Sequence, residues 1–366
     1  MIDRSEIFNP VEMGEVTLSN RILMAPLTRN RSHSDGTPKQ LARTYYHQRS
    51  SAGLIFTEAT QISAMAKGYL DTPGIYTEKH IEEWRGITDA VHSGGGLIFC
   101  QLWHVGRISH SSLLPDGRAP LAPSAIQADT KTFTANGFEE CSKPIAMTKE
   151  DINQTLRDYK IAAECARKAG FDGVEIHSAN GYLLDQFLQD GTNNRDDEYG
   201  GSIENRLRLL NEVIDVVSSV WPKTRIGVRL SPLGQAGDIS DSHAEATFAA
   251  AYKAISEAHL AYMHVVEQFG GDDQSGERAL IKRLRKHFTG FYIANGGYDK
   301  DSACKVIESG HADAVTFGRL FISNPDLPER FRLNAKLNTP NEKTFYGGGV
   351  EGYTDYPFLN KEREAA

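Results

Sequence analysis

Three residues able to bind an oxygen atom and to deliver a proton closely follow one predicted strand. His177, Asn180 and Tyr182 come within six residues of the strand segment 174–176 (VEI). A histidine and an asparagine three residues apart can donate hydrogen bonds to one oxygen atom, and the tyrosine supplies a phenolic proton nearby. The spacing predicts a chemical site at the end of a strand. A structural interpretation stays open, in which His177 ends the strand and Tyr182 packs in the core.

This strand belongs to a repeating pattern, in which a short strand precedes an amphipathic helix and polar residues follow the strand. Eight strands are predicted, at residues 22–26, 54–60, 96–103, 173–177, 226–231, 262–267, 291–295 and 314–318. Apolar residues at every third or fourth position predict a helix over 203–221. A Thr-x-x-acid start predicts another helix after Met147 that ends before Gly170.

Eight strand and helix units predict an α/β fold, a closed (β/α)8 TIM barrel, because parallel strands need covering helices and right-handed crossovers. An open doubly wound sheet is the alternative, although no GxGxxG motif follows the first strand. Residues 11–20 predict an N-terminal β-hairpin that caps the barrel. Residues 104–147 are expected to form a lid after the third strand. The chain, 1–366, is predicted to be a single domain.

The composition narrows the class of ligand. With a formal net charge of -8 and no block of lysines or arginines, the chain is not expected to bind nucleic acid, which leaves a small molecule. No stretch of about 18 apolar residues could span a membrane, and the N-terminus lacks the apolar core of a secretion signal. The cysteines are widely spaced without a CxxC pair, which is typical of free thiols in a reducing compartment. We therefore expect a cytoplasmic protein without membrane contact.

The residues at the carboxyl ends of the predicted strands define the candidate site, because active sites of TIM barrels form there. They include Thr28, Glu58, Gln101, His104, His177, Arg229, Glu267, Asn295 and Arg319. No metal site is expected, since only one strand ends in a histidine with a suitable neighbour. Arg229 would be costly to bury unless it faces an anion or an electron-rich ring. A pair between Arg229 and the inward-facing Glu175 is the alternative.

The last two strand ends predict a phosphate site. Residues 295–297 (NGG) and 317–319 (FGR) follow the seventh and eighth strands, where barrels bind phosphate through backbone amides and a guanidinium. A Gly-Gly turn alone is a weak signal, because tight turns need glycine whatever they bind. The two turns together, with Arg319, favour a phosphorylated ligand.

Six motifs in order resemble the old yellow enzyme family of FMN-dependent ene-reductases, in particular its bacterial N-ethylmaleimide reductase and xenobiotic reductase members. They are residues 24–29 (MAPLTR), 101–107 (QLWHVGR), 177–187 (HSANGYLLDQF), 195–202 (RDDEYGGS), 228–232 (VRLSP) and 352–357 (GYTDYP). The resemblance runs from about Phe8 to Pro357. It implies an FMN-binding (β/α)8 barrel, in agreement with the strand pattern.

The resemblance also implies non-covalently bound FMN across the carboxyl end of the barrel, with NADPH or NADH as the reductant. The implied cofactor-binding residues are Ala25, Pro26, Leu27, Thr28, Ala59, Gln101, Arg229, Asn295, Gly296, Gly297, Phe317, Gly318 and Arg319. Thr28 would donate its hydroxyl near flavin O4, Gln101 would bind the pyrimidine edge, and Arg229 would lie beside N1 and O2. The two glycine turns and Arg319 would hold the phosphate.

The catalytic roles implied by the resemblance fall on the first motif described above. His177 and Asn180 would bind the carbonyl or nitro oxygen of an activated alkene, and Tyr182 would protonate the α carbon. The implied substrate pocket is lined by Tyr69, Trp103, His177, Asn180 and Tyr346. Hydride would pass in a ping-pong sequence from the nicotinamide to flavin N5 and then to the β carbon. Implied substrates are α,β-unsaturated carbonyls, maleimides and nitroalkenes, with nitro compounds and nitrate esters as further candidates.

Some features leave alternatives open. Residues 267–277 and 128–141 depart from the relatives, which leaves cofactor preference and substrate range unassigned. Thr28 stands where some members have cysteine, so no redox-sensitive cysteine switch is expected beside the flavin. Another FMN-barrel dehydrogenase, a non-catalytic flavin or ligand sensor, and a barrel isomerase for a sugar phosphate are the rival functions. A monomer or a homodimer is expected.

Overall fold

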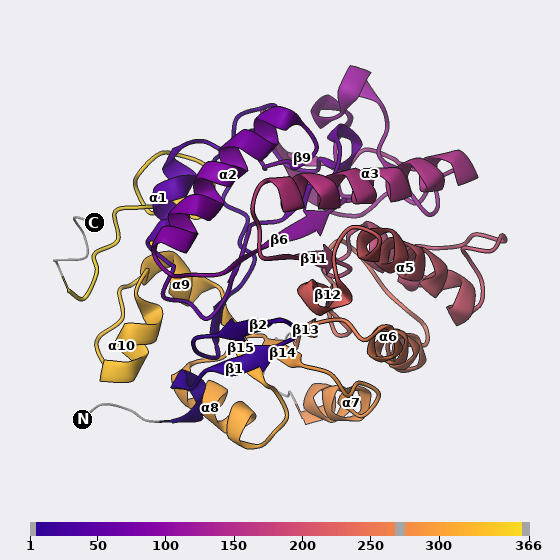
Figure 1. The fold of residues 1–366 in the computed structure, drawn as a ribbon. Coiled ribbons are helices and arrows are strands. Elements are labelled where there is room, and N and C mark those ends of the chain that lie inside the picture. The colour runs from indigo at the N-terminus through magenta and orange to yellow at the C-terminus, as the bar shows by residue number, and fades with distance from the viewer. Residues whose placement is uncertain (1–4, 268–274, 361–366) are drawn as a thin grey trace.

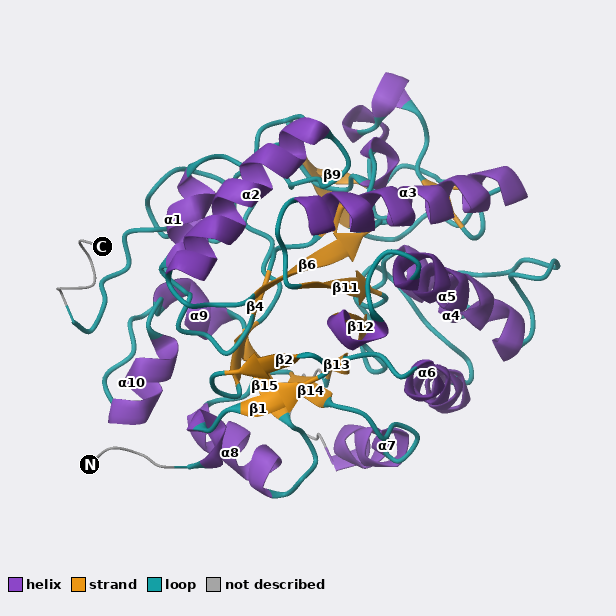
Figure 2. Cartoon of the chain, in the orientation of Figure 1, coloured by secondary structure: helices purple, strands orange, loops and turns teal. Residues whose placement is uncertain are grey.

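The chain forms a closed barrel of parallel strands inside a ring of helices (Figures 1 and 2). A computed structural model describes residues 5–267 and 275–360. The barrel strands in this part of the chain are β3 (Ile22–Met24), β4 (Ile55–Phe56), β6 (Ile98–Trp103), β11 (Gly173–His177), β12 (Ile226–Leu230), β13 (Tyr262–Val266), β14 (Tyr292–Asn295) and β15 (Ala314–Phe317). β15 pairs with β3, and β11 pairs with both β6 and β12, so the sheet closes on itself. The predicted (β/α)8 barrel is confirmed, and the open-sheet alternative is wrong.

The second barrel strand is broken, in contrast to the single strand predicted over residues 54–60. The chain forms β4 and then a separate strand β5 (Thr60–Gln61), and both pair with β6. Between them, the Glu58 N–H donates to the Tyr46 hydroxyl at 3.0 Å. The Glu58 carboxylate in turn accepts the Arg29 N–H at 3.0 Å. Side-chain hydrogen bonds therefore replace strand pairing at this point.

Helices follow the barrel strands and cover them from outside (Figure 2). They are α1 (Leu41–His47), α2 (Glu78–Ser93), α3 (Lys149–Lys168), α4 (Leu183–Leu188), α5 (Ile203–Ser218), α6 (Ala244–Ala258), α7 (Ser275–Arg285), α8 (Lys300–Glu308), α9 (Arg319–Ser323) and α10 (Leu327–Leu333). Short 3-10 helices lie at Glu6–Phe8, Ala64–Ala66, Ser111–Leu113, Pro115–Gly117, Lys223–Arg225 and Glu342–Thr344. The predicted start of α3 is confirmed, because Thr148 and Asp151 cap each other's backbone N–H groups. α5 ends before the predicted residue 221, although Trp221 stays buried and donates to the Ala163 carbonyl of α3 at 2.9 Å.

The inside of the barrel changes from apolar to polar along the strands. Its amino end is filled by an apolar cluster made of Met13, Val16, Leu18, Leu23, Leu54, Phe56, Phe99, Ala261, Tyr262, Ile293 and Ala314. The first three come from the antiparallel hairpin of β1 (Val11–Met13) and β2 (Val16–Leu18), which therefore caps this end as predicted. Above the cluster lies a buried polar layer made of Gln101, Glu175, His264 and Thr316. The candidate site begins directly beyond this layer.

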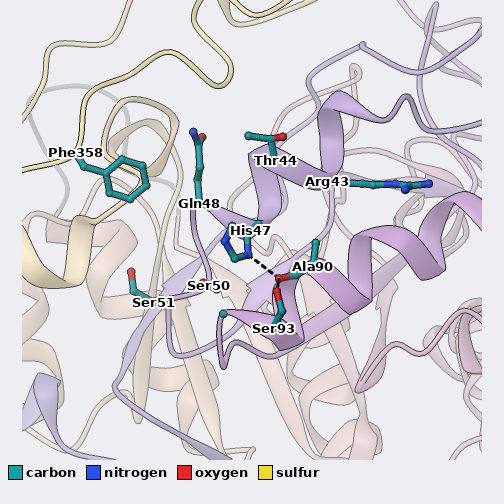
Figure 3. A pocket seen from close by; sticks show the side chains of 10 residues that line it. Arg43, Thr44, His47, Gln48, Ser50, Ser51, Ala90, Ser93 and Phe358 are labelled. Carbon is teal, nitrogen blue, oxygen red and sulfur yellow. Dashed lines mark hydrogen bonds between the residues drawn. The ribbon is translucent and has the colours of Figure 1, made fainter. Parts of the chain in front are cut away.

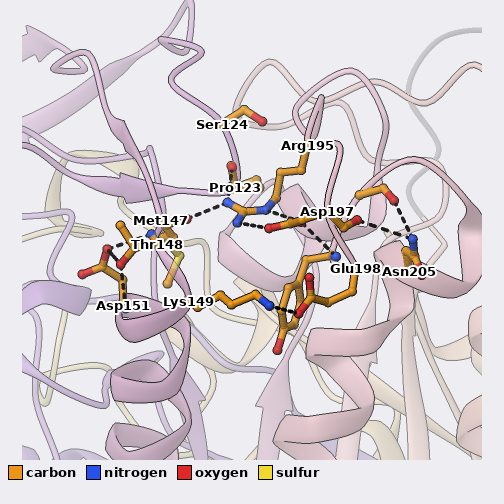
Figure 4. A network of polar contacts seen from close by, with 12 residues as sticks. Pro123, Ser124, Met147, Thr148, Lys149, Asp151, Arg195, Asp197, Glu198 and Asn205 are labelled. Atoms are coloured by element: carbon orange, nitrogen blue, oxygen red, sulfur yellow. Dashed lines mark hydrogen bonds and ion pairs between the residues drawn. The ribbon is translucent and has the colours of Figure 1, made fainter.

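Residues 104–147 form an excursion with strands of its own. β7 (Leu121–Ala122) pairs with β10 (Ile145–Ala146), and β8 (Lys131–Thr134) forms a hairpin with β9 (Gly137–Glu140). Arg195, in the loop before α5, donates through Nη1 to the carbonyls of Pro123 at 2.9 Å and Met147 at 2.7 Å (Figure 4). Its other nitrogens hold the Asp197 carboxylate at 2.9 and 2.5 Å. One guanidinium therefore anchors the excursion to the barrel.

Candidate active site

His177 ends β11, and the turn that follows holds Asn180 and Tyr182. Asn180 and Gly181 both adopt left-handed backbone conformations, with φ of 58° and 76°. A Cβ atom on Gly181 would lie 2.1 Å from the Ala236 carbonyl oxygen, so only glycine fits there. The Asn180 N–H donates to the Ser231 hydroxyl at 2.7 Å, which fixes the turn to the end of β12. Tyr182 directly precedes α4.

A buried carboxylate stabilises this turn. Asp185 Oδ2 accepts the Gly181 N–H at 2.9 Å and lies 3.4 Å from the Ser231 hydroxyl, and Oδ1 accepts from Gln189 at 2.8 Å. Burial raises the pKa of Asp185 to about 6, against the lowering effect of these hydrogen bonds. The group is therefore largely ionised at neutral pH and can hold the turn that presents Asn180.

Aromatic rings form one wall of the site. The Trp103 ring stacks on Tyr69 at 5.8 Å and meets the Tyr182 ring edge-on at 5.0 Å between centroids. The Tyr182 ring lies 5.2 Å from the His177 ring. The hydroxyls of Tyr69 and Tyr182 lie 3.1 Å apart, within hydrogen-bond distance. The Tyr182 ring is thus packed, as the structural interpretation expected, while its hydroxyl joins a polar pair.

Burial fixes the charge states of these groups. It raises the pKa of Tyr182 above the ordinary 10.0 and raises that of Tyr69 further, so both hydroxyls keep their protons at neutral pH. Burial, followed by the charge of Arg229, lowers the pKa of His177 well below 6.5. The imidazole is therefore neutral. Its Nδ1 is buried and has no hydrogen-bond partner among the described residues.

Arg229 lies beside His177 on the neighbouring strand β12. Its Nη2 donates to Asn295 Oδ1 at 2.9 Å, and Asn295 Nδ2 donates to the Thr316 carbonyl at 3.2 Å. The expected alternative, a hydrogen-bonded pair of Arg229 with Glu175, does not form within the described chain. Arg229 Nε is buried and has no partner among these residues. The guanidinium therefore keeps a donor for a ligand.

A cavity of about 280 Å³ opens next to the ends of β3 and β15. Its walls are formed by Pro26, Leu27, Thr28, Arg319, Ile322, Phe345 and Tyr346. Arg319 is exposed, and no hydrogen bond or ion pair joins it to the part of the chain that is described. Gly297 has a φ of 72°, and a Cβ there would meet nothing within 4 Å. Both features of the predicted phosphate site are thus open to a ligand.

A larger cavity, of about 510 Å³, is lined in part by Gly296 and Gly297 of the predicted phosphate turn. A cavity of about 650 Å³ lies elsewhere and is formed by α1, the end of α2 and Phe358 of the C-terminal segment (Figure 3). Its His47 Nδ1 is 2.7 Å from the Ala90 carbonyl oxygen. The ends of α1 and α2 lead to the amino ends of β4 and β6, which is the end of the barrel opposite to the candidate site. This cavity contains none of the predicted site residues.

Comparison with known proteins identifies the family. Residues 6–338 match the model of the NADH:flavin oxidoreductase / NADH oxidase family. The chain is 45% identical over 361 residues to 12-oxophytodienoate reductase 1 of Oryza sativa subsp. japonica, covering 97% of this chain and 93% of the relative. It is similar to the structure of morphinone reductase in complex with tetrahydroNAD, with a TM-score of 0.91, 44% identity and coverage of 97% and 98%. The old yellow enzyme homologue from Zymomonas mobilis gives a TM-score of 0.92, 45% identity and coverage of 96% and 99%.

The chain belongs to the NADH:flavin oxidoreductase / NADH oxidase family. The predicted resemblance to old yellow enzyme is confirmed, and the chain is an FMN-dependent NAD(P)H oxidoreductase of that type. The site fits FMN. Arg229 Nε, a buried donor without a partner among the described residues, suits an acceptor atom of a flavin, because an unpaired buried donor costs about 1–3 kcal/mol. Arg319 and the open Gly297 turn suit the phosphate.

The structure brings most of the predicted family residues to one face. Ala25 and Ala59 are buried at strand ends, and Ala25 N–H donates to the Phe317 carbonyl at 3.1 Å. The Phe317 ring points away from the site, into the core against Phe331, so only its main chain lies there. Tyr346 is 64% exposed at the mouth of the smaller cavity.

The structure describes one of the two segments that depart from the relatives, and only part of the other. Most of residues 267–277 lies outside the described residues, because 268–274 are not described. Residues 128–141 reach the site, where Ala128 and Cys141 pack against Tyr69 and Tyr182. Sequence reasoning missed Asp185 as a support of the turn. An aspartate four residues after an Asn-Gly glycine is a signal for such a role, because its carboxylate can accept turn N–H groups.

No helix in the described part of the chain combines the length and the apolar character that crossing a membrane requires.

Proposed function

We propose that this enzyme reduces carbon–carbon double bonds activated by a carbonyl or nitro group, with NADPH or NADH as the reductant. α,β-Unsaturated carbonyls, maleimides and nitroalkenes are the proposed substrates, and nitro compounds and nitrate esters are further candidates. One observation carries the proposal: the His177 ring, whose buried Nδ1 has no partner among the described residues, lies 5.2 Å from the ring of Tyr182, and burial keeps the Tyr182 hydroxyl protonated. Relatives named as reductases of 12-oxophytodienoate and morphinone support it.

The proposed FMN site runs along the carboxyl ends of the strands. We assign to it Ala25, Pro26, Leu27, Thr28, Ala59, Gln101, Arg229, Asn295, Gly296, Gly297, Phe317, Gly318 and Arg319. Thr28 and Gln101 would bind the ring edge, Arg229 would donate from Nε, and Arg319 would hold the phosphate with the two glycine turns. When bound, FMN supplies the hydride-transfer chemistry between the nicotinamide and the alkene.

His177 and Asn180 are the proposed anchor for the substrate oxygen. Two donors aimed at one oxygen polarise the conjugated double bond, and they stabilise the negative charge that develops on this oxygen as the β carbon gains hydride. Removing one such donor typically slows a reaction by about 100-fold to 1,000-fold. The left-handed turn at Asn180 and its hydrogen bond to Ser231 hold the second donor in place.

Tyr182 is the proposed proton donor to the α carbon. Its hydroxyl is protonated at neutral pH and lies 3.1 Å from the Tyr69 hydroxyl, which can orient it. Tyr69, Trp103 and Tyr346 would line the substrate pocket. The packing of Ile108 and Cys141 against the two tyrosines supports a role for residues 104–147 as a lid that excludes water.

The finer assignments are also proposals. We propose that the enzyme is of the N-ethylmaleimide reductase type, although the relatives compared with it are named for other substrates. The single domain over 1–366, with residues 104–147 as a lid excursion, is another. We also propose that the protein is a monomer or a homodimer. A location in the cytoplasm is proposed as well, because four free cysteines are typical of a reducing compartment. Gel filtration with light scattering measures the oligomeric state.

The visible absorbance of the purified protein, followed by anaerobic mixing with NADPH and 2-cyclohexenone, tests the function. We expect a yellow protein that NADPH bleaches and the enone recolours, with cyclohexanone as product. A yellow protein that the nicotinamide reduces but no alkene reoxidises would favour the sensor or another dehydrogenase. A colourless preparation that binds no added FMN would refute the proposal.

A further inference from the structure

A carboxylate is buried inside the barrel, directly below the candidate site, and the proposed function does not use it. Glu175 lies in the middle of β11 with 0% exposure. It precedes His177 by two residues, so strand alternation turns both side chains toward the barrel axis. Below it lies the apolar cluster at the amino end of the barrel. Burying a carboxylate here is costly unless its oxygens are hydrogen-bonded and its charge is compensated.

Both oxygens of Glu175 have partners on other strands. Oε1 accepts from Gln101 Nε2 at 2.7 Å, and Oε2 lies 2.9 Å from His264 Nδ1. His264 Nε2 continues the chain to the Thr316 hydroxyl at 2.9 Å. The four side chains come from β11, β6, β13 and β15, so the network spans the inside of the barrel.

The network determines which end of the Gln101 amide is free. An amide has one donor end and one acceptor end. Glu175 accepts one of the two N–H groups of Nε2 and thereby fixes the orientation of the amide, and the carbonyl oxygen Oε1 makes no hydrogen bond within the described chain. Gln101 would therefore act as an acceptor toward the flavin edge. A flavin presents one N–H donor on its pyrimidine ring, at N3.

The network also carries negative charge close to Arg229. Burial lowers the pKa of His264 despite the raising effect of Glu175, so the imidazole is neutral at neutral pH and donates from Nδ1. Burial lowers the pKa of Arg229, and the charge of Glu175 counteracts this lowering, although no hydrogen bond joins the two side chains in the described chain. The carboxylate thus offsets the charge of the guanidinium, while Arg229 Nε has no partner in the described part of the chain and stays available to a ligand.

We propose that Glu175 is a positioning residue that orients the Gln101 amide, offsets the charge of Arg229 and thereby sets the reduction potential of the bound FMN. The inference rests on the proposed FMN site. Reduction adds negative charge to the cofactor, so a carboxylate below it opposes reduction. Removing this charge should make reduction easier.

Glu175→Gln tests the proposal, because it keeps the shape of the side chain and removes its charge. The midpoint potential of the bound FMN is measured by spectroscopic titration against a reference dye, without any alkene. We expect a shift to a more positive potential of about 30 mV or more, which is a tenfold change in the equilibrium constant of a two-electron couple. Glu212→Gln is the matched control. Glu212 lies on the outer helix α5 and accepts a hydrogen bond from the Tyr199 hydroxyl, so this variant should not change the potential.

A potential for Glu175→Gln that equals the wild-type value would overturn the proposal. If Glu175→Gln does not retain FMN, Glu175→Asp tests the positioning role instead. Aspartate keeps the negative charge but is too short to bind Gln101 and His264 together. An FMN dissociation constant raised by about tenfold, with the potential kept, supports the positioning role. An unchanged dissociation constant refutes it. These measurements need only bound flavin, so their outcome does not depend on whether the enzyme reduces alkenes.

Discussion

Tyr182→Phe tests the proposed proton donor with little disturbance of its surroundings. The Tyr182 ring packs against Trp103 and His177, at centroid distances of 5.0 and 5.2 Å, and phenylalanine retains both contacts. The lost group is the hydroxyl, which lies 3.1 Å from the Tyr69 hydroxyl. One such hydrogen bond contributes about 1 kcal/mol to the free energy of unfolding. The variant is therefore expected to fold and to keep its cofactor.

The expected loss falls on the alkene half of the reaction. General acid catalysis contributes about 100-fold to 10,000-fold. Because burial raises the pKa of Tyr182 above 10.0, this residue is a weaker acid than free tyrosine, and we expect the lower end. A loss of about 100-fold corresponds to about 2.7 kcal/mol of transition-state stabilisation. Reduction of the flavin by NADPH does not use this proton and should proceed nearly as before.

Stopped-flow absorbance measures the two halves separately, with 2-cyclohexenone as the alkene. The rate of the alkene half should fall less with maleimides and nitroalkenes, because solvent can protonate these strongly activated acceptors. Tyr69→Phe is the matched control, since it breaks the same hydroxyl pair but leaves the proton on Tyr182. It should slow the alkene half only slightly. Equal slowing of both halves in Tyr182→Phe, or none with 2-cyclohexenone, would leave Tyr182 a packing residue.

Arg319→Ala should weaken FMN binding by about tenfold or more, the cost of one charge-assisted hydrogen bond, and unchanged flavin retention on gel filtration would contradict its phosphate role. Phenols should bind the oxidised enzyme with a long-wavelength absorption band, and His177→Ala should weaken that binding; an unaltered affinity would remove His177 as the anchor. Burial raises the pKa of Asp185 to about 6, above the ordinary 3.8, so its charge is lost as the pH falls through about 6. This protonation adds stability to the fold but weakens the hold on Gly181, so phenol affinity should drop below this pH, and Asp185→Asn should lack the transition.

The barrel could be predicted from the sequence because its signals are local. Apolar runs with polar ends marked the strands, and β11 occupies the predicted residues, Gly173–His177. The break between β4 and β5 could not be predicted in this way. It depends on the Tyr46 hydroxyl and on the Arg29 N–H, which come from other segments of the chain and meet Glu58 only after folding.

The candidate site could also be predicted only in part. His177, Asn180 and Tyr182 could be identified from the sequence because one short segment carries all of them. The hydroxyl pair of Tyr69 and Tyr182 joins residues 113 positions apart, and no spacing rule connects them. Side-chain direction also escaped prediction where a strand ends, since the Phe317 ring turns into the core while its main chain stays at the site.

Arg229 shows why the partners of a buried charge matter more than its position. The sequence left two possibilities, a ligand or a pair with Glu175. A direct pair would use the guanidinium donors and leave little for a flavin. In the structure, Glu175 is held by Gln101 and His264, and Arg229 Nη2 is held by Asn295. The positive charge is thereby compensated through space while Nε has no partner among the described residues, and this combination would allow a buried arginine to bind the proposed cofactor.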